Sequence, residues 1–319
     1  MLPLALACAA LFPAGADAFV GCKYSAGAVT VTLSQEDDAV TIQRDRGTTD
    51  VNVITGAEYD GPSILVNCKG GDPTVTNTDT ITIEVGPEAF FSDLSIDLGE
   101  GSLAPGATPE ADGTSEIEIR ANVLGEDSDL TLIGSAGPDL VQMGRIENGL
   151  VGANLNAAAE GASADVDLSI SSAADVEFEG EAGNDVLLTR GGPGFRGRLG
   201  KAFLFAEGGD GRDTLVSGAD RSFLSGDDGR DRLLGSNGAD IALGGDGRDV
   251  IKTGNGEDRV QALRGGRDKI DCGGGKSDRA RLDRKDRSHG CEQRRHGRRG
   301  RRPILLPFAA ARVSASEHP

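Results

Sequence analysis

The sequence is short of the residues from which large cores and most catalytic sites are built. It has no tryptophan and only two methionines in 319 residues, and aromatic residues amount to 4%. Any hydrophobic core must therefore be thin. The three histidines, His289, His296 and His318, all lie near the C-terminal end. Neither H-E-x-x-H nor G-x-S-x-G occurs, so the zinc-protease and serine-hydrolase signatures are excluded.

Long apolar runs are also missing after the first residues. The late stretch ILLPFAAARV at 304–313 is shorter than the roughly 18 apolar residues of a membrane-spanning helix. The sequence therefore predicts no transmembrane segment.

Glycine, by contrast, is abundant, with 48 residues in the chain, which is about twice its usual share. The three-residue period of collagen is absent, so the glycines are expected in turns. Hydrophobic residues reach 37%, which argues against a disordered chain. The net charge is −18, yet residues 279–319 carry 12 Lys and Arg against four Asp and Glu. The sequence thus combines an acidic body with a basic end.

The N-terminus has the pattern of a secretory signal peptide. Residues 1–18 are mostly apolar and end in Ala16-Asp17-Ala18, an A-x-A cleavage pattern. We expect cleavage after Ala18 and a secreted, extracellular protein; an ordinary buried N-terminal segment is the alternative.

Four cysteines follow the expected cleavage site, and an even number in an exported chain predicts disulfides. Three pairings are possible. We favour Cys22–Cys68 and Cys272–Cys291 because each pair lies within one region of the sequence. No C-x-x-C occurs, and the spacing fits no zinc module.

Residues 19–200 are expected to be rich in β-strands and acidic. Short runs in this region alternate apolar and polar residues, separated by Gly, Asp, Asn and Pro, as in half-buried strands. A sandwich and a solenoid both fit this pattern. The runs are AVTVTL (28–33), ITIEV (81–85), LSIDL (94–98), IEIRA (117–121), LTLIG (130–134), VDLSI (166–170) and VEFEG (176–180).

A strict nine-residue repeat occupies residues 201–281. An aspartate recurs at the sixth position, with glycine usually two residues before it and an apolar residue two residues after it, while Ser222 fills one vacant position. Glycine permits tight turns, so each unit predicts a six-residue turn and a three-residue strand. Two units make one 18-residue coil, and coils stack about 4.8 Å apart. The predicted fold is all-β, a parallel β-roll or β-solenoid.

Stacking the coils places aspartates on a common edge. Carboxylates about 5 Å apart repel one another, and a hard cation between them reverses that effect. Ca²⁺ accepts six to eight oxygen ligands in loose geometry, whereas Mg²⁺ needs a tight octahedron. Soft metals prefer His or Cys, and of these the repeats contain only Cys272. Arg212, Arg230 and Arg248 recur every 18 residues and could instead form a surface ladder with neighbouring aspartates, which would stabilise little.

GGDGRDTLV (208–216), GDDGRDRLL (226–234), GGDGRDVIK (244–252) and TGNGEDRVQ (253–261) resemble the G-G-x-G-x-D-x-U-x repeat of RTX, or haemolysin-type, calcium-binding proteins. Fainter copies stand at 134–141 and 180–188. The resemblance implies a parallel β-roll with Ca²⁺ bound between successive turns. The implied ligands are Asp213, Asp231, Asp240, Asp249, Asp258 and Asp268, with the turn residues Gly209, Gly211, Gly229, Gly238, Gly245, Gly247, Gly254 and Gly256.

Within the repeats, the clearest predicted sites pair turns one coil apart. The unit with Ser222 in place of the aspartate is expected to bind weakly. The expected pairs are 211–213 with 229–231, 229–231 with 247–249, and 238–240 with 256–258.

Residues 282–319 are expected to form a basic, disordered tail. Such a tail can attach to anionic cell-surface polymers or lipids. Nucleic acid is not an expected partner, because no aromatic residues alternate with the charges and the chain is predicted to be exported. The sequence does not specify an oligomeric state.

Taken together, these features predict a secreted, non-catalytic protein in which Ca²⁺ drives folding of the β-roll. The first alternative is a surface adhesin or matrix protein. The second is a polysaccharide-active enzyme with its site in residues 20–200, because a site assembled from separate coils of a solenoid leaves no local motif.

Overall fold

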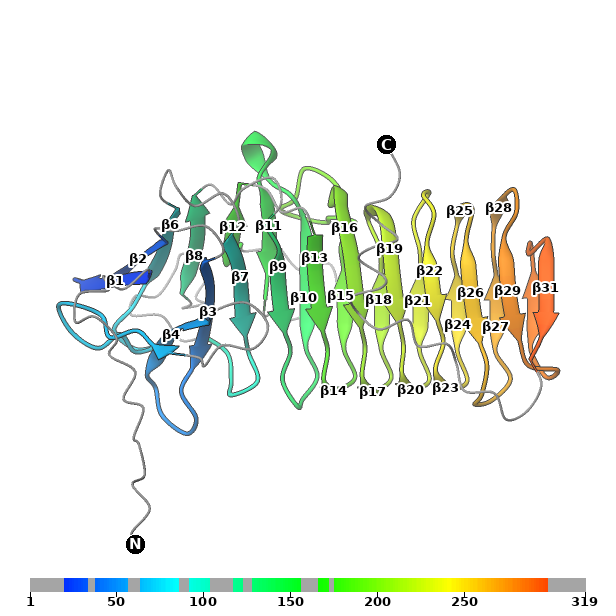
Figure 1. Cartoon of the computed structure of the whole chain (residues 1–319), viewed down its shortest axis with the longest axis horizontal. Coiled ribbons are helices and arrows are strands. Elements are labelled where there is room, and N and C mark those ends of the chain that lie inside the picture. Colours follow the sequence, from blue (N-terminus) through cyan, green and yellow to red (C-terminus); the bar gives the residue numbers. More distant parts are fainter. Residues whose placement is uncertain are drawn as a thin grey trace, which may run out of the picture.

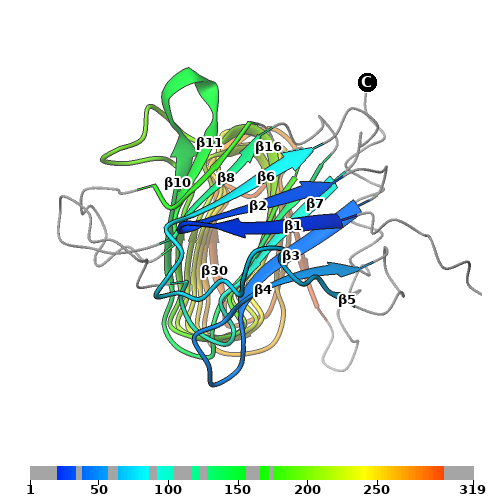
Figure 2. The same cartoon turned by 90° about the vertical axis from the view of Figure 1, so that its left-hand side faces the viewer.

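The computed structural model describes residues 20–33, 38–56, 64–85, 92–103, 117–122, 128–155, 166–171 and 175–297. Two long sheets lie face to face and form an elongated stack (Figures 1 and 2). The described residues contain no α-helix and one 3-10 turn, η1 (Glu147–Gly149). The predicted leader, residues 1–18, lies outside the described residues.

Sheet A has 13 strands. Their spatial order is β1 (Val20–Ser25), β2 (Ala28–Leu33), β6 (Thr80–Val85), β8 (Glu118–Asn122), β12 (Leu168–Ile170), β11 (Val151–Asn154), β10 (Leu140–Arg145), β15 (Val186–Leu188), β18 (Thr214–Val216), β21 (Arg232–Leu234), β24 (Val250–Lys252), β27 (Lys269–Asp271) and β30 (Arg287–His289).

Sheet B has 12 strands. Their spatial order is β31 (Gln293–His296), β29 (Arg279–Leu282), β26 (Arg259–Ala262), β22 (Ile241–Leu243), β19 (Ala219–Ser225), β16 (Gly200–Glu207), β13 (Asp175–Glu179), β9 (Leu130–Ile133), β7 (Ser92–Asp97), β3 (Asp38–Arg44), β4 (Val51–Gly56) and β5 (Ile64–Leu65).

Two narrow ladders connect successive turns, one at each edge of the stack (Figure 1). The first contains β14 (Ala182–Gly183), β17 (Asp210–Gly211), β20 (Asp228–Gly229) and β23 (Asp246–Gly247). The second contains β25 (Asn255–Gly256) and β28 (Gly274–Gly275).

Parallel pairing puts each apolar repeat residue on its counterpart in the next coil. In sheet A, Leu215 pairs with Leu233 and Leu233 with Ile251. In sheet B, Leu224 pairs with Ala242. These side chains point inward and are at most 1% exposed, so the core of the repeat region is one side chain deep per strand. The predicted all-β parallel roll is confirmed.

Apart from β14, the described strands of residues 20–200 belong to the same two sheets as the repeats. β15 pairs in parallel with both β10 and β18, and β13 with both β9 and β16. All seven alternating runs identified in the sequence form strands. Antiparallel pairs interrupt the parallel stacking at two places: β1 pairs with β2, and β3 with β4, in hairpins at the N-terminal end, and β11 lies antiparallel between β10 and β12 in sheet A.

The coils continue beyond residue 281, where we had expected a disordered tail. β30 pairs in parallel with β27 and β31 with β29, so the expectation is wrong for residues 287–296. The side chains of β31 are exposed, and this basic segment is held by backbone pairing with β29, next to the Cys272–Cys291 disulfide. The rest of the predicted tail, residues 298–319, lies outside the described residues.

Both favoured disulfides are confirmed, and they lie near opposite ends of the stack. Cys22 in β1 bonds Cys68, and Cys272, directly after β27, bonds Cys291, two residues before β31. Each bridge thus ties an end coil to the stack.

Removing the second bridge is expected to loosen the last coil. A disulfide typically contributes about 2–4 kcal/mol, by restricting the unfolded chain. In the double substitution Cys272→Ser and Cys291→Ser, amide hydrogen exchange in β30 and β31 should accelerate, while the central repeats keep their protection. The matched pair Cys22→Ser and Cys68→Ser should accelerate exchange at β1 and β2 instead. Unchanged exchange in β30 and β31 would contradict the prediction.

Candidate metal centre

The sixth-position aspartates form two files along the stack, each residue directly preceding a strand. Most of them are buried despite their charge, with Asp213, Asp231 and Asp249 at most 1% exposed, whereas Asp139 and Asp286 are half-buried. The first file precedes strands of sheet A and contains Asp139, Asp185, Asp213, Asp231, Asp249, Asp268 and Asp286. The second precedes strands of sheet B and contains Asp240, Asp258, Asp278 and Glu292.

Past Asp139, one carboxylate oxygen of the file member joins two coils. The backbone N–H of Asp213 donates to Oδ1 of Asp231 at 2.9 Å, and that of Asp231 donates to Oδ1 of Asp249 at 3.1 Å. The second file repeats the contact, since Asp258 N–H donates to Oδ1 of Asp278 at 2.9 Å. The 18-residue spacing therefore brings the predicted partners together.

The other carboxylate oxygen is buried and accepts no hydrogen bond. A buried charged oxygen in this condition is costly and calls for a cation or a proton. The atom is Oδ2 of Asp185, Asp213, Asp231, Asp249, Asp258, Asp268 and Asp278.

Backbone carbonyl oxygens lie close to the glycines of the same turns. Gly211 has a φ of 158° and Gly247 a φ of 154°. A Cβ on either would lie 1.5 or 1.4 Å from the carbonyl oxygen of Gly183 or Gly229, respectively, one coil earlier. Only glycine fits so close to these oxygens, and the predicted turn residue Gly229 meets the carbonyl of Gly211 in the same way.

The remaining predicted turn glycines repeat this close approach. A Cβ on any of them would lie 1.6–2.1 Å from a carbonyl oxygen of the preceding coil. They are Gly209, Gly238, Gly245, Gly254 and Gly256.

Burial and neighbouring carboxylates make these aspartates unusually basic. Desolvation and, to a lesser extent, the charges of Asp249 and Asp213 raise the pKa of Asp231 to about 7, against a backbone hydrogen bond that lowers it. Desolvation likewise raises the pKa of Asp185 and Asp249 to about 7. For Asp213, Asp258 and Asp268 the pKa rises to about 6.

The donor set fits a hard cation. In the described part of the chain, no three His, Cys, Asp or Glu side chains converge on one point. A bound ion would therefore be held by no more than two such carboxylates together with main-chain carbonyls. Calcium tolerates such a mixed, all-oxygen shell, whereas softer metals need nitrogen or sulfur ligands.

Residues 207–242 and 234–268 match the family model of the RTX calcium-binding nonapeptide repeat (4 copies). Residues 207–268 are RTX calcium-binding repeats. RTX nonapeptide repeats bind Ca²⁺, which agrees with the oxygen-only turns. No curated protein and no solved structure matches the chain significantly.

Among the six predicted ligands, Asp240 has different surroundings from the other five. Its Oδ1 accepts a hydrogen bond from Ser222 Oγ at 2.7 Å. Its Oδ2 accepts one from the backbone N–H of Ser236 at 2.6 Å and one from Ser236 Oγ at 3.1 Å. The carboxylate is thus satisfied by protein groups, and its role as a calcium ligand stays a prediction.

A serine in the second turn position distinguishes this turn, GSNGAD (235–240). The hydroxyl of Ser236 accepts from the N–H of Gly238 at 3.1 Å while donating to Asp240. The upstream turn GSAGPD (134–139) has the same contacts between Ser135, Gly137 and Asp139. The equivalent Gly209 of an RTX turn has a φ of 82°, whereas Ser236 is not among the residues with positive φ.

Several file members were not among the predicted ligands. Asp185 lies in GEAGND (180–185), one of the faint upstream copies, where the sixth-position aspartate was the available signal. Asp278 follows Asp258 by 20 residues instead of 18, and this slip obscures its register. Glu292 accepts from the N–H of Asp278 at 2.8 Å, and no aspartate marks its position.

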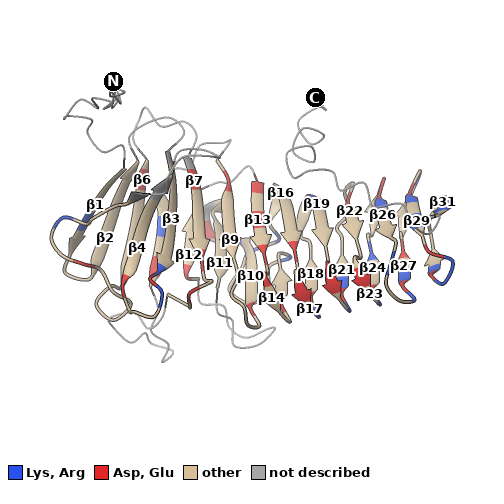
Figure 3. Ribbon diagram, turned by 60° about the horizontal axis from the view of Figure 1, so that its bottom comes forward, with Lys and Arg blue, Asp and Glu red and all other residues tan. Residues whose placement is uncertain are grey.

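The arginine ladder receives no support from the described ion pairs. Arg212, Arg230 and Arg248 are exposed. The salt bridges within the described ranges do not include them. Figure 3 shows acidic residues along the turns that carry β17, β20 and β23, and basic residues toward the end that carries β29 and β31.

Metal-free protein is expected to lose stability as the pH rises from about 4 to about 7. Because folding raises the pKa of Asp231 and Asp249 from 3.8 to about 7, the folded state binds more protons than the unfolded state in this window, and the free energy of unfolding falls as pH rises. Thermal unfolding of metal-depleted protein across this range measures the effect. Asp231→Asn should weaken the dependence, whereas Asp228→Asn, at an exposed position in the same turn, should not. A melting temperature that rises with pH would contradict the prediction.

Substitutions of Ser236 are expected to separate the two kinds of turn. Ser236→Ala removes one hydrogen bond to Asp240 and should lower stability by about 1 kcal/mol, with or without calcium. Ser236→Gly restores the glycine of the RTX turn and should add calcium-binding capacity. Isothermal titration calorimetry and thermal melts measure both effects, with Ala239→Ser at an exposed position as the control. Calcium stoichiometry unchanged by Ser236→Gly would refute the interpretation of this turn.

Proposed function

We propose that the protein is secreted and that Ca²⁺ between stacked turns drives folding of the β-roll, without catalysis. The observation that carries the proposal is the row of buried Oδ2 atoms without hydrogen-bond partners in the aspartate files. In the unfolded chain these carboxylates are solvated by water, whereas in the stacked coils they lie near one another and are buried. Calcium supplies the positive charge that balances them.

The proposed ligands are the aspartates in which one carboxylate oxygen is buried without a hydrogen-bond partner. In the first file these are Asp185, Asp213, Asp231, Asp249 and Asp268, and in the second Asp258 and Asp278. The turn carbonyls beside Gly211, Gly229 and Gly247 complete the donor set.

Coupling of folding to calcium follows from the geometry. Each site takes groups from two coils that are 18 to 20 residues apart in the sequence, so the site exists only when the coils are stacked. The free energy of binding then becomes free energy of folding. Extracellular calcium sites work at Kd values on the order of 10⁻⁴ to 10⁻³ M. The repeats would therefore remain loose at low calcium inside the cell and fold outside it.

Export is supported by two features. The signal-like residues 1–18 predict it, and two disulfides suit an oxidising compartment. No helix among the described residues has the length and apolarity to cross a membrane.

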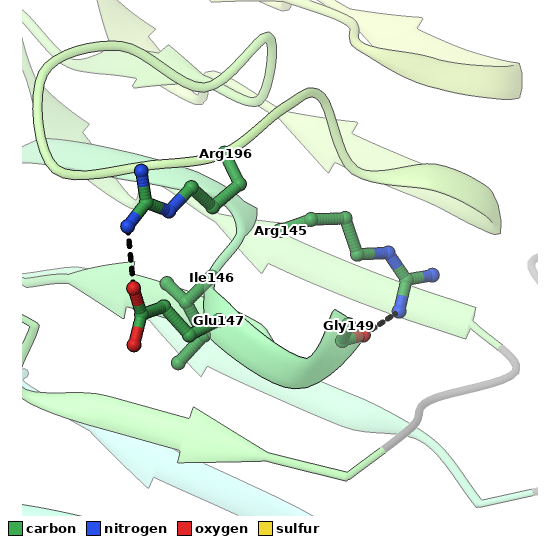
Figure 4. A pocket seen from close by; sticks show the side chains of 5 residues that line it. All are labelled: Arg145, Ile146, Glu147, Gly149 and Arg196. Atoms are coloured by element: carbon green, nitrogen blue, oxygen red, sulfur yellow. Dashed lines mark hydrogen bonds and ion pairs between the residues drawn. The ribbon is translucent and has the colours of Figure 1, made fainter.

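The shallow pocket in Figure 4 does not support the enzyme alternative. The pocket is lined by Arg145, Ile146, Glu147, Gly149 and Arg196. Arg145 donates to the carbonyls of Leu199 and Gly149, and Arg196 pairs with Glu147. Both cations are thus engaged with the protein. The adhesin alternative stays a prediction.

Calcium titration of the full chain, followed by circular dichroism, tests the proposal. β-Structure is expected to increase with calcium. A β signal already complete in excess chelator would overturn the folding role.

Asp231→Ala is expected to weaken two neighbouring sites, because Asp231 lies between Asp213 and Asp249 in the first file. Calorimetric stoichiometry should fall relative to the wild type, and the calcium concentration needed for folding should rise. Asp228→Ala changes an exposed carboxylate in the same turn and should have little effect. Wild-type stoichiometry in Asp231→Ala would show that the ligand assignment is wrong.

A further inference from the structure

Two nitrogens of Arg190 bind carbonyl oxygens of two later coils. Arg190 lies in the connection 189–199, which leads from β15 in sheet A to β16 in sheet B. This connection and the turns with β25 and β28 form the second edge of the stack, opposite the first edge with β14, β17, β20 and β23 (Figure 1). Nε of Arg190 donates to the carbonyl of Ser217 at 3.0 Å, and Nη2 donates to the carbonyl of Gly235 at 2.7 Å. The guanidinium thus joins three successive coils.

Both carbonyls belong to the first residue of a repeat unit, and in the glycine turns this carbonyl lies near an unpartnered carboxylate oxygen. Gly226 and Gly244 are the first residues of successive units on the first edge. A Cβ on Gly226 would lie 2.7 Å from Oδ2 of Asp231 and 2.8 Å from the carbonyl oxygen of Gly244. Because calcium accepts carboxylate and carbonyl oxygens together, the first carbonyl of a unit is a further donor for a cation held by Oδ2 of the preceding turn.

The turn 217–222 lacks the acidic half of this arrangement. Ser222 stands where other units have aspartate, and its hydroxyl donates to Oδ1 of Asp240 at 2.7 Å. The unit has no sixth-position carboxylate to share a cation with the carbonyl of Gly235, and that carbonyl accepts from Arg190 instead. A guanidinium carries a permanent positive charge and only donors, so toward carbonyl oxygens it can replace a metal ion.

A second arginine of the same connection binds the same turn. Nη1 of Arg198 lies 2.8 Å from Oδ1 of Asp220 and donates to the carbonyl of Gly218 at 3.3 Å. Asp220 occupies the fourth position of its unit, where Gly211 stands in a calcium turn. The connection therefore places two cations on a turn that has lost its sixth-position aspartate.

We propose that Arg190, assisted by Arg198, takes the place of a calcium ion between the turns 217–222 and 235–240. At this level the second edge is stacked by the charge of the protein itself, while the glycine turns of the first edge depend on calcium. The inference rests on the proposed function, because it divides that function between the two edges. Its consequence is a calcium-independent segment, formed by β16, β19 and β22, within repeats that are otherwise loose at low calcium.

Amide hydrogen exchange of the full chain in excess chelator tests the proposal. In the wild type, amides of 217–225 and 235–243 are expected to stay protected, whereas those of the glycine turns 208–213 and 244–249 exchange quickly. Arg190→Ala should accelerate exchange in 217–225 and 235–243 by about tenfold, the effect of losing hydrogen bonds from a charged donor. The acceleration should be the same with calcium, because no metal takes over the missing contacts.

Arg196→Ala is the matched control. Arg196 lies in the same connection, but its guanidinium pairs with Glu147 (Figure 4). Its removal takes a cation from the connection without touching the carbonyls of the second edge, so exchange in 217–225 and 235–243 should match the wild type. Equal acceleration in both variants, or none in Arg190→Ala, would overturn the proposal.

Restoring the missing aspartate gives a second test. Ser222→Asp alone should leave the calcium stoichiometry unchanged, because Arg190 balances the new carboxylate and keeps the carbonyl of Gly235. Ser222→Asp combined with Arg190→Ala recreates a calcium turn and should bind an additional calcium ion in isothermal titration calorimetry. Circular dichroism in calcium checks that each variant folds. A gain from Ser222→Asp alone, or no gain in the folded double variant, would contradict the assignment.

Failure of this inference and failure of the proposed function give different results. If calcium leaves exchange in the first-edge turns of the wild type unchanged, the folding role of calcium is wrong, and the comparison of Arg190→Ala with Arg196→Ala in chelator still decides the role of Arg190. If calcium protects those turns while Arg190→Ala behaves as the wild type, only the role of Arg190 is wrong.

Discussion

The stacking of like charges in a desolvated turn is the constraint on which the repeat region depends. In the glycine turns, the aspartate uses Oδ1 to accept the N–H of the previous coil, as between Asp213 and Asp231, and so fixes the register of one coil on the next. The same contact leaves Oδ2 buried with no donor. A single residue thus supplies both the attraction that aligns two coils and the repulsion that must be neutralised. The thin aliphatic core beneath it cannot offset that repulsion by size.

The repeat region could be predicted from the sequence because every unit forms the same turn and strand with the same residue types. A glycine that meets a carbonyl, such as Gly211, a buried carboxylate, such as Asp213, and an inward apolar residue, such as Leu215, recur at fixed offsets. The local disulfides were also predictable. Residues 20–200 were ambiguous because alternation shows which face of a strand is buried but not which strand it pairs with. The order of β30 and β31 was missed because backbone pairing can hold strands whose side chains are basic and exposed.

Asp240 shows why identical motif letters can have unequal surroundings. Its position in the repeat is the same as that of Asp249, but Ser236 and Ser222 donate hydrogen bonds to its oxygens. The second donor comes from a residue 18 positions away, so the difference depends on the stacked structure. The chain therefore satisfies its turn carboxylates in two ways, with hydroxyl groups in the serine turns and, in our proposal, with calcium in the glycine turns.

The two ends of the stack have a consequence for the whole molecule. A stack of identical coils sets no limit on the number of coils it contains. The exposed edge of a terminal coil can pair with further strands from another chain. Here the hairpins β1–β2 and β3–β4 reverse strand direction at one end, so a parallel coil cannot be added in register. At the other end β31 presents the row Gln293, Arg294, Arg295 and His296, which are exposed and carry two arginines. Two such strands carry like charge, which opposes their pairing edge to edge.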